Sequence, residues 1–333
     1  MRPFIIAEIG VNHDGSLEKA IDLIDAAKSA GASAAKFQSF SANRLATEVT
    51  PKVEYQRIGD GERTHYEMLK QLELSFSDQA KLKKYCDSVG IEFISTPYAV
   101  EDAIFLNSIN VNCFKIASAD IVDLPLLEYV SKTKKLTLIS TGMASIDEIK
   151  SAAKFFHSSN SNFVLMHTTS EYPTKLEFTN ISRLKALIQF DSSGIGFSDH
   201  TTDSIGAIMA IALGATYFEK HFTLDKTDSG PDHAASLEPE EFKKYVLDIE
   251  AGFKALGSAE FVRTAGEEGM AKTSRKSLHY SRDLEVGNIL GVSDLVLLRP
   301  GTGVMWSECE KFLERALKHK VAKGTMLRIQ DFQ

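Results

Sequence analysis

The sequence predicts an α/β protein: a (β/α)₈ barrel, the TIM-barrel fold, followed by a small β-rich domain. Apolar segments of strand length alternate eight times with segments of helical periodicity over residues 1–257, which matches such a barrel in length and order. An open doubly wound sheet is the competing fold, but no G-x-G-x-x-G run follows the first strand. We therefore predict a barrel over 1–257, a linker over 258–276 and a second domain over 277–333.

The eight predicted strands are apolar along most of their length, as strands buried on both faces of a parallel sheet should be. In chain order they are Phe4–Glu8, Ser33–Gln38, Glu92–Ser95, Cys113–Ile116, Leu136–Ser140, Phe163–His167, Gly194–Ser198 and Tyr217–Phe222. A barrel gathers their polar ends at one rim, and these ends are Glu8, Lys36, Gln38, Thr96, Lys115, Ser140, His167, Ser198, His200, Glu219 and His221.

The predicted helices show apolar residues at helical spacing and recognisable ends. The first five are about Leu17–Ala30, a stretch near Tyr66, Ser77–Val89, Glu101–Leu106 and a stretch after Leu124. The sixth is opened by the capping box Ser145–Glu148, and the seventh has an apolar stripe at Ile205, Ile208, Met209 and Ala212. The last runs from Pro239 to Gly257 with Phe242, Tyr245, Val246 and Ile249 on one face. The polar stretch from Ser41 to Arg63 is longer than most loops, and such loops are usually functional or disordered.

Two histidines end the strands of one predicted β-α-β unit within the segment from Gly196 to Ser236. His200 follows the first strand and His221 ends the second. Because such strands are parallel, both imidazoles should emerge at the same end of the sheet. With Asp199 and Glu219 beside them, they could hold a divalent metal and leave positions open for oxygen ligands. From spacing alone, the alternative that each is a hydrogen-bonded structural histidine stays open.

Two lysines, Lys36 and Lys115, lie inside apolar strands. A lone buried ammonium group is costly, so each needs a partner. A bound polyanion, such as a phosphate or a carboxylate, would explain both. An ion pair with Glu8 or Asp120 is the alternative.

The composition is that of a globular protein, with 43% hydrophobic and 25% charged residues. The net charge of −7 provides no basic surface for nucleic acid or membranes. The three cysteines are far apart without CxxC spacing, which indicates a reducing compartment. The apolar run at the N-terminus is too short for a signal peptide, so we expect a cytoplasmic protein. Residues 277–333 contain short alternating runs broken by turns, typical of a small domain that docks onto something larger.

Ordered motifs along the whole chain resemble the sialic acid synthase family, whose members make N-acetylneuraminate, legionaminate and pseudaminate. The motifs are IIAEIGVNHDGS, KFQSF, STPY, FKIAS, STGM, TSEYPT, GFSDHT, EKHFTLDK, GPDHAASLEP, RKSL and RPGTG. The resemblance implies that the last domain is an antifreeze-like (SAF, β-clip) domain. It also implies a transferase that condenses phosphoenolpyruvate with an N-acyl hexosamine, such as N-acetylmannosamine or 2,4-diacetamido-2,4,6-trideoxymannose, and releases phosphate by C–O cleavage.

The resemblance implies a role for each matching residue. His200 and His221 match the ligands of a divalent metal, usually Mn²⁺ or Mg²⁺ and with Co²⁺ possible. Glu8 is the first candidate for proton transfer, and Glu219 the second. Residues matching positions that hold phosphoenolpyruvate are Lys36, Thr96, Lys115, Ser118, Ser140 and Ser198. Residues matching positions around the sugar are Glu8, Gln38, Asp120, Tyr172 and Asp232. Arg299 matches an arginine that the partner subunit inserts over the acyl group, which implies a domain-swapped homodimer.

Two departures bear on the sugar. Many relatives have Gly and Glu after the serine that matches Ser118, whereas this chain has Ala119 and the shorter Asp120. The run GPDHAAS is closer to neuraminate- and legionaminate-type than to pseudaminate-type enzymes. The alternatives are a related phosphoenolpyruvate-dependent synthase acting on a pseudaminate-type sugar or a sugar phosphate, and a non-catalytic sugar-binding protein. The sequence identifies neither the hexosamine nor the metal.

Overall fold

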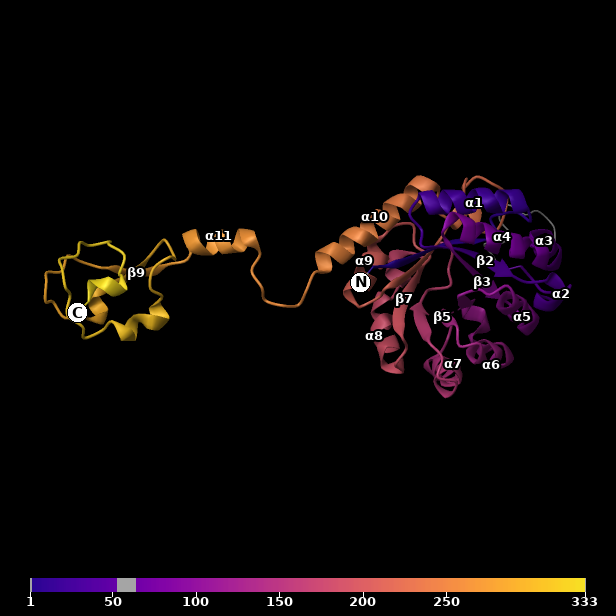
Figure 1. Cartoon of the computed structure of the whole chain (residues 1–333). Helices are drawn as coiled ribbons and strands as arrows, with labels where there is room; N and C mark the ends of the chain where they lie inside the picture. The colour runs from indigo at the N-terminus through magenta and orange to yellow at the C-terminus, as the bar shows by residue number, and fades with distance from the viewer. Residues whose placement is uncertain (1, 53–63, 333) are drawn as a thin grey trace. The chain divides into compact units, whose positions relative to one another are not determined.

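The computed structural model describes residues 2–52 and 64–332. Two compact units make up the chain, Met1–Gly257 and Ser258–Gln333, and we describe each by itself (Figure 1). The first part of the polar stretch predicted from Ser41 to Arg63 forms the short helix α2 (Ala42–Leu45), and residues 53–63 lie outside the described residues.

Unit 1 is a closed barrel of eight parallel strands in chain order, which confirms the predicted fold. The strands are β1 (Phe4–Gly10), β2 (Ala34–Ser39), β3 (Glu92–Pro97), β4 (Cys113–Ile116), β5 (Leu136–Ser140), β6 (Phe163–His167), β7 (Gly194–Asp199) and β8 (Tyr217–His221). β8 pairs with β1 and closes the ring. In this register Glu8 lies opposite Lys36 on one side and opposite His221 on the other.

Helices surround the barrel (Figure 1). Besides α2 they are α1 (Leu17–Ser29), α3 (His65–Leu72), α4 (Phe76–Val89), α5 (Val100–Ser108), α6 (Leu124–Lys132), α7 (Ile146–Ser158), α8 (Leu184–Leu187), α9 (Ile205–Ala212) and α10 (Pro239–Leu256). The predicted capping box of Ser145 and Glu148 is present, and Pro239 lies in the first turn of α10.

The connection between β6 and β7 differs from the expected regular helix. Here α8 has only four residues and is flanked by single 3₁₀ turns at Ile181–Arg183 and Ile188–Phe190. Asn180 and Asp191 adopt left-handed conformations on either side of these turns. Both residue types tolerate that conformation, so they end the helical path at both sides.

The barrel interior changes character along its axis. Side chains of alternate strand residues point inward, and the inner core is apolar at the amino-terminal side of the strands. Its buried members are Ile6, Ala34, Ile94, Cys113, Leu138, Val164 and Met166. Two residues further along β1 and β2, the same inward positions hold Glu8 and Lys36. The charged groups therefore lie at the carboxyl ends of the strands, where TIM-barrel active sites are found.

The apolar stripe predicted for α9 is not its buried face. Ile205, Ile208 and Met209 are 49%, 42% and 50% exposed. The buried residues are Gly206, Ala207, Ala210 and Ile211. All residues of this helix are apolar or Gly, so periodicity could not identify the buried face. Packing instead places Gly206 on the buried face, because a Cβ at this position would lie 3.0 Å from the ring of Phe197.

Unit 2 is small and irregular. It contains α11 (Ala265–Ser274) and an antiparallel pair, β9 (Ser277–Tyr280) and β10 (Leu295–Leu298). Its core is formed by Leu278, Tyr280, Leu284, Leu290, Leu295, Cys309, Phe312, Leu317, Val321, Leu327 and Phe332. The segment predicted as a linker, 258–276, thus includes α11, whose Lys272 carbonyl accepts a 2.8 Å hydrogen bond from the Gly301 amide. Within residues 2–52 and 64–332, no helix is long and apolar enough to cross a membrane.

Candidate active site

Most of the predicted site residues meet at the carboxyl ends of the strands. They occupy inward-facing positions of seven strands, or follow a strand directly. Those that are at most 8% exposed are Glu8, Lys36, Thr96, Lys115, Ser140, Ser198, His200, Glu219 and His221. His167 is an exception among the polar strand ends: its Nε2 lies 2.7 Å from the Thr179 carbonyl and its ring stacks on Phe197. Its neighbour Thr168 occupies the inward position instead, because side chains alternate along a strand.

An ion-pair network joins the two lysines to two glutamates. Lys36 Nζ lies 2.6 Å from Glu8 Oε2 and 3.7 Å from Glu219 Oε2. Lys115 Nζ lies 3.9 Å from Glu219 Oε1 and 2.6 Å from Ser140 Oγ. Of the predicted ion-pair partners, Glu8 pairs with Lys36, whereas Lys115 faces Glu219 and not Asp120. The bound polyanion stays a prediction. Two ammonium groups and two carboxyl groups share one buried space.

The surroundings separate the two glutamates in proton affinity. Burial raises the pKa of Glu8, and repulsion from Glu219 adds to the increase although Lys36 opposes it. Burial also opposes ionisation of Glu219, but Lys115 and Lys36 outweigh it and lower the pKa of Glu219 well below its ordinary value. Ser198 supports that charge by donating a 2.9 Å hydrogen bond to Glu219 Oε1. Carboxyl groups whose pKa values diverge in this way are typical of acid–base sites.

The two histidines have the geometry of metal ligands with open positions. Their ring centroids are 5.5 Å apart. His200 Nδ1 lies 2.7 Å from the Thr169 carbonyl, which can only accept a hydrogen, so its Nε2 carries the lone pair. His221 Nδ1 is buried without a hydrogen-bond partner among the described residues, and Asp232 Oδ2 is 3.9 Å from it. Burial lowers the pKa of both imidazoles, which keeps them neutral as a metal requires.

A group of hydroxyls near the end of β5 could bind an anion by donating hydrogen bonds to it. Ser118 Oγ accepts a 3.1 Å hydrogen bond from the Gly142 amide. Glycine is required at position 142, because a Cβ there would lie 2.8 Å from Ser118 Oγ and would also clash with Ser170 Oγ. Together with Ser140 and the Lys115 ammonium group, these hydroxyls surround one end of the site with hydrogen-bond donors.

The residues expected around the sugar lie on the other side of Glu8. A Cβ on Gly10 would be 3.2 Å from Gln38 Nε2, 3.3 Å from Glu8 Oε1 and 3.4 Å from Asp232 Oδ2. These three groups therefore converge beside a residue without a side chain. Burial raises the pKa of Asp232 to about 6.

Tyr172 and Asp120 border the same region. The Tyr172 ring packs 4.1 Å from the His200 ring and meets His221 edge-on at 5.4 Å, centroid to centroid. Burial, together with the charge of Asp123, raises the pKa of Asp120 to about 7, and its Oδ2 is buried without a hydrogen-bond partner among the described residues.

Tyr98 is a residue of this region that the sequence analysis missed. Burial raises its pKa well above its ordinary value, and the charges of Asp120 and Glu8 add to the effect. Its ring packs edge-on against Phe40, with centroids 6.0 Å apart. It follows Thr96 by two residues, so strand alternation could have identified it.

Arg299 belongs to unit 2 and is described there. Its Nε donates a 2.9 Å hydrogen bond to the Ser274 carbonyl at the end of α11. None of the contacts described within unit 2 tests the predicted role of Arg299 over the acyl group, which stays a prediction.

Comparisons with known proteins agree on one family. The model of the NeuB family matches residues 23–261. An N,N'-diacetyllegionaminic acid synthase from Legionella pneumophila is 40% identical, over 98% of this chain and 94% of its own. Human N-acetylneuraminate-9-phosphate synthase is 39% identical, over 77% of this chain and 71% of its own. The crystal structure of an N-acetylneuraminic acid synthetase from Leptospira borgpetersenii serovar Hardjo-bovis matches with a TM-score of 0.72 and 33% identity, over 81% of this chain and 90% of that one.

Proposed function

The chain belongs to the NeuB family, and on that premise we propose that it is a nonulosonic acid synthase that condenses phosphoenolpyruvate with an N-acyl hexosamine. One observation carries the proposal. Two ammonium groups, two carboxyl groups of different proton affinity and two neutral imidazoles meet at the carboxyl end of one barrel. The ammonium groups suit the trianionic phosphoenolpyruvate, the carboxyl groups suit a proton transfer, and the imidazoles suit a cation that polarises a carbonyl group.

The lysines and hydroxyls are assigned to phosphoenolpyruvate. Lys36 and Lys115 supply positive charge in a buried site, where it stabilises an anion more strongly than in water. The neighbouring hydroxyls and the amide that complete the phosphoenolpyruvate site come from Thr96, Ser118, Ser140, Gly142 and Ser198. When phosphoenolpyruvate binds, its negative charges replace part of the ion pairing between the lysines and the glutamates.

The histidines are assigned to a divalent cation, with Mn²⁺ as the first candidate and Mg²⁺ or Co²⁺ as alternatives. The unpartnered Nδ1 of His221 and the lone pair on His200 Nε2 fit this role. When bound, the cation supplies Lewis-acid polarisation of a carbonyl oxygen. Tyr172 packs on both rings and holds their planes.

The reaction balances with one proton carrier. C3 of phosphoenolpyruvate forms a bond to the aldehyde carbon, and the aldehyde oxygen takes a proton from Glu8, whose pKa burial raises to about 7. Water adds at C2 and returns a proton to Glu8. The tetrahedral intermediate then loses inorganic phosphate by C–O cleavage: the C2 hydroxyl becomes the carbonyl group of a 2-keto acid, and the hydroxyl proton leaves with the phosphate. Glu219 remains ionised and balances the lysines throughout.

We carry the swapped homodimer forward as part of this proposal, with Arg299 of a second copy over the acyl group of the sugar. Mixing an inactive variant with one that is impaired at low sugar concentration tests it, with the sugar kept below the wild-type KM. His221→Ala removes one barrel site and Arg299→Ala removes one lid, so a swapped heterodimer keeps one intact site. Random assortment should restore roughly a quarter of the wild-type activity. No restored activity would contradict the swap.

Phosphate release tests the function itself. The chain is incubated with phosphoenolpyruvate, Mn²⁺ and either N-acetylmannosamine or 2,4-diacetamido-2,4,6-trideoxymannose. We expect release that requires a sugar and that EDTA abolishes. Release only with a pseudaminate-type sugar, or with a sugar phosphate such as arabinose or erythrose phosphate, would support the related synthases instead. Sugar binding without any release would support the non-catalytic alternative.

A further inference from the structure

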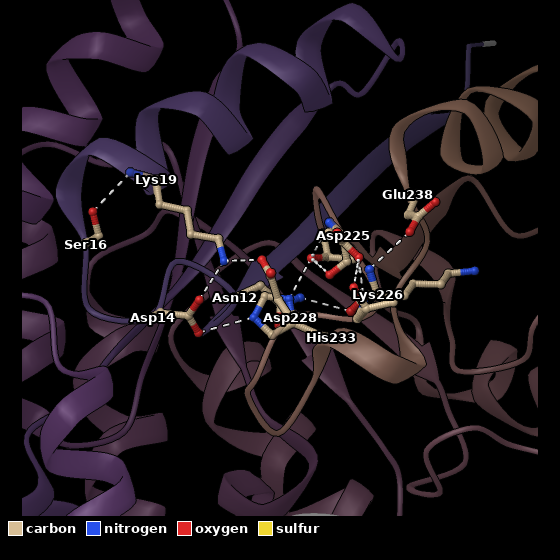
Figure 2. Close-up of polar contacts among 12 residues, drawn as sticks. Asn12, Asp14, Ser16, Lys19, Asp225, Lys226, Asp228, His233 and Glu238 are labelled. Carbon is tan, nitrogen blue, oxygen red and sulfur yellow. Dashed lines mark hydrogen bonds and ion pairs between the residues drawn. The ribbon is translucent and has the colours of Figure 1, made fainter. Parts of the chain in front are cut away.

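Two loops at the carboxyl end of the barrel are tied together by a cluster outside the proposed reaction site (Figure 2). Lys19, in the first turn of α1, places its Nζ 2.6 Å from Asp14 Oδ2 and 2.6 Å from Asp228 Oδ2. Asp14 belongs to the loop after β1, and Asp228 belongs to the loop after β8. One ammonium group thus bridges two carboxylates from opposite ends of the barrel sequence.

His233 joins the same two loops from the interior. It is fully buried, with Nε2 3.2 Å from Asp14 Oδ1 and Nδ1 2.7 Å from Thr223 Oγ1 (Figure 2). Because a carboxylate only accepts, Nε2 carries the hydrogen. The backbone of Gly230 packs directly on this pair: a Cβ there would lie 2.7 Å from the His233 ring and 3.3 Å from Asp14 Oδ1.

Asn12 adds a third tie. Its Nδ2 donates to the Phe222 carbonyl and to Ser236 Oγ, both at 2.9 Å. Ser236 Oγ in turn donates a 2.6 Å hydrogen bond to the Asp232 carbonyl. Asp232 is therefore flanked by His233 on one side and by the Ser236 contact on the other, and its carboxylate faces Gln38 and Glu8.

A metal site is the competing reading of this cluster. Asp14, Asp228 and His233 each offer a ligand atom, and these atoms lie within 4.8 Å of one another. However, Lys19 Nζ already contacts both carboxylates. A divalent cation in the same place would face that ammonium group at close range, which is strongly unfavourable.

We propose that Asp14, Lys19, Asp228 and His233 form a positioning clamp that holds residues 223–236 so that Asp232 stays beside Glu8. The Lys19 ammonium group supplies the positive charge that joins the Asp14 and Asp228 carboxylates. Through Asp232 the clamp sets the affinity for the sugar, and this second part rests on the proposed function. The ordering of residues 223–236 does not rest on it.

Lys19→Met in the full chain tests both parts. Without substrate, we expect amide exchange of residues 223–236 to become about fivefold faster, which corresponds to a lost bridge worth about 1 kcal/mol. In the synthase assay we expect the KM for the sugar to rise about tenfold, with the KM for phosphoenolpyruvate changed less than about twofold. Lys19→Arg keeps the charge and should restore both readouts. The control is Lys81→Met, which removes an exposed pair with Asp78 on α4 and should change neither.

Each outcome decides a separate point. Unchanged exchange in Lys19→Met would overturn the clamp. Faster exchange with an unchanged KM for the sugar would overturn its role in sugar affinity. Absence of phosphate release by the wild-type protein would overturn the synthase function, and the exchange result would still decide the clamp.

Discussion

Replacing Asp120 by Asn should stabilise the fold at alkaline pH, because this carboxyl group is held where its charge is unfavourable. Its pKa rises from an ordinary 3.8 to about 7 through burial and through the charge of Asp123. A pKa raised on folding contributes stability that is fully present below the unfolded value and is lost as the pH rises through the folded value. The wild-type protein should therefore lose stability between about pH 4 and pH 7 through this group.

The magnitude follows from the shift. About three pKa units correspond to about 4 kcal/mol, and we expect about half of that because Asp120 is partly exposed. Asn has nearly the same shape and no charge. We expect Asp120→Asn to be about 2 kcal/mol more stable than the wild type near pH 8.5 and nearly equal to it near pH 4.

Urea unfolding followed by far-ultraviolet circular dichroism measures this difference. Asp147→Asn is the control: the Asp147 side chain is 85% exposed and pairs with Lys150 at 3.3 Å, so its replacement should change stability by less than about 0.5 kcal/mol at either pH. The reasoning about Asp120 is refuted if Asp120→Asn changes stability equally at both pH values, or destabilises the fold at high pH. The same variant should raise the KM for the sugar if Asp120 contacts it.

Three further variants address the reaction site. His221→Ala should abolish turnover and the increase in melting temperature caused by Mn²⁺ while circular dichroism stays native; retained turnover would remove the metal assignment. Lys115→Met should lower kcat/KM for phosphoenolpyruvate about 10- to 100-fold, since a hydrogen bond to a charged group is worth about 1.5–3 kcal/mol; steady-state kinetics showing an effect on the sugar alone would contradict the assignment. Arg299→Ala should raise the KM for the sugar about tenfold or more with little change for phosphoenolpyruvate, and equal changes in both would refute the lid.

Strand alternation explains why much of the site could be predicted. Residues two apart on a strand share a face, so Glu8 follows Ile6 into the barrel and Lys36 follows Ala34. Parallel pairing then brings the strand ends together. The prediction that placed His167 with these rim residues is wrong, because His167 lies one position out of phase with the inward-facing residues of its strand.

Other features depend on contacts that local sequence does not encode. The buried face of α9 is decided by the fit of Gly206 against Phe197, because the helix is apolar all round. The bond between Asp14 and His233 joins residues 219 apart in sequence, and nothing in either loop alone indicates the other. The difference in proton affinity between Glu8 and Glu219 depends on their distances to the two lysines.

A crystal structure with Mn²⁺ and phosphoenolpyruvate tests the central claim most directly. The account predicts that both His200 and His221 coordinate the ion, and that Lys36 and Lys115 contact the phosphate or the carboxylate of the donor. A donor bound away from both lysines, or an ion held without the imidazoles, would contradict it.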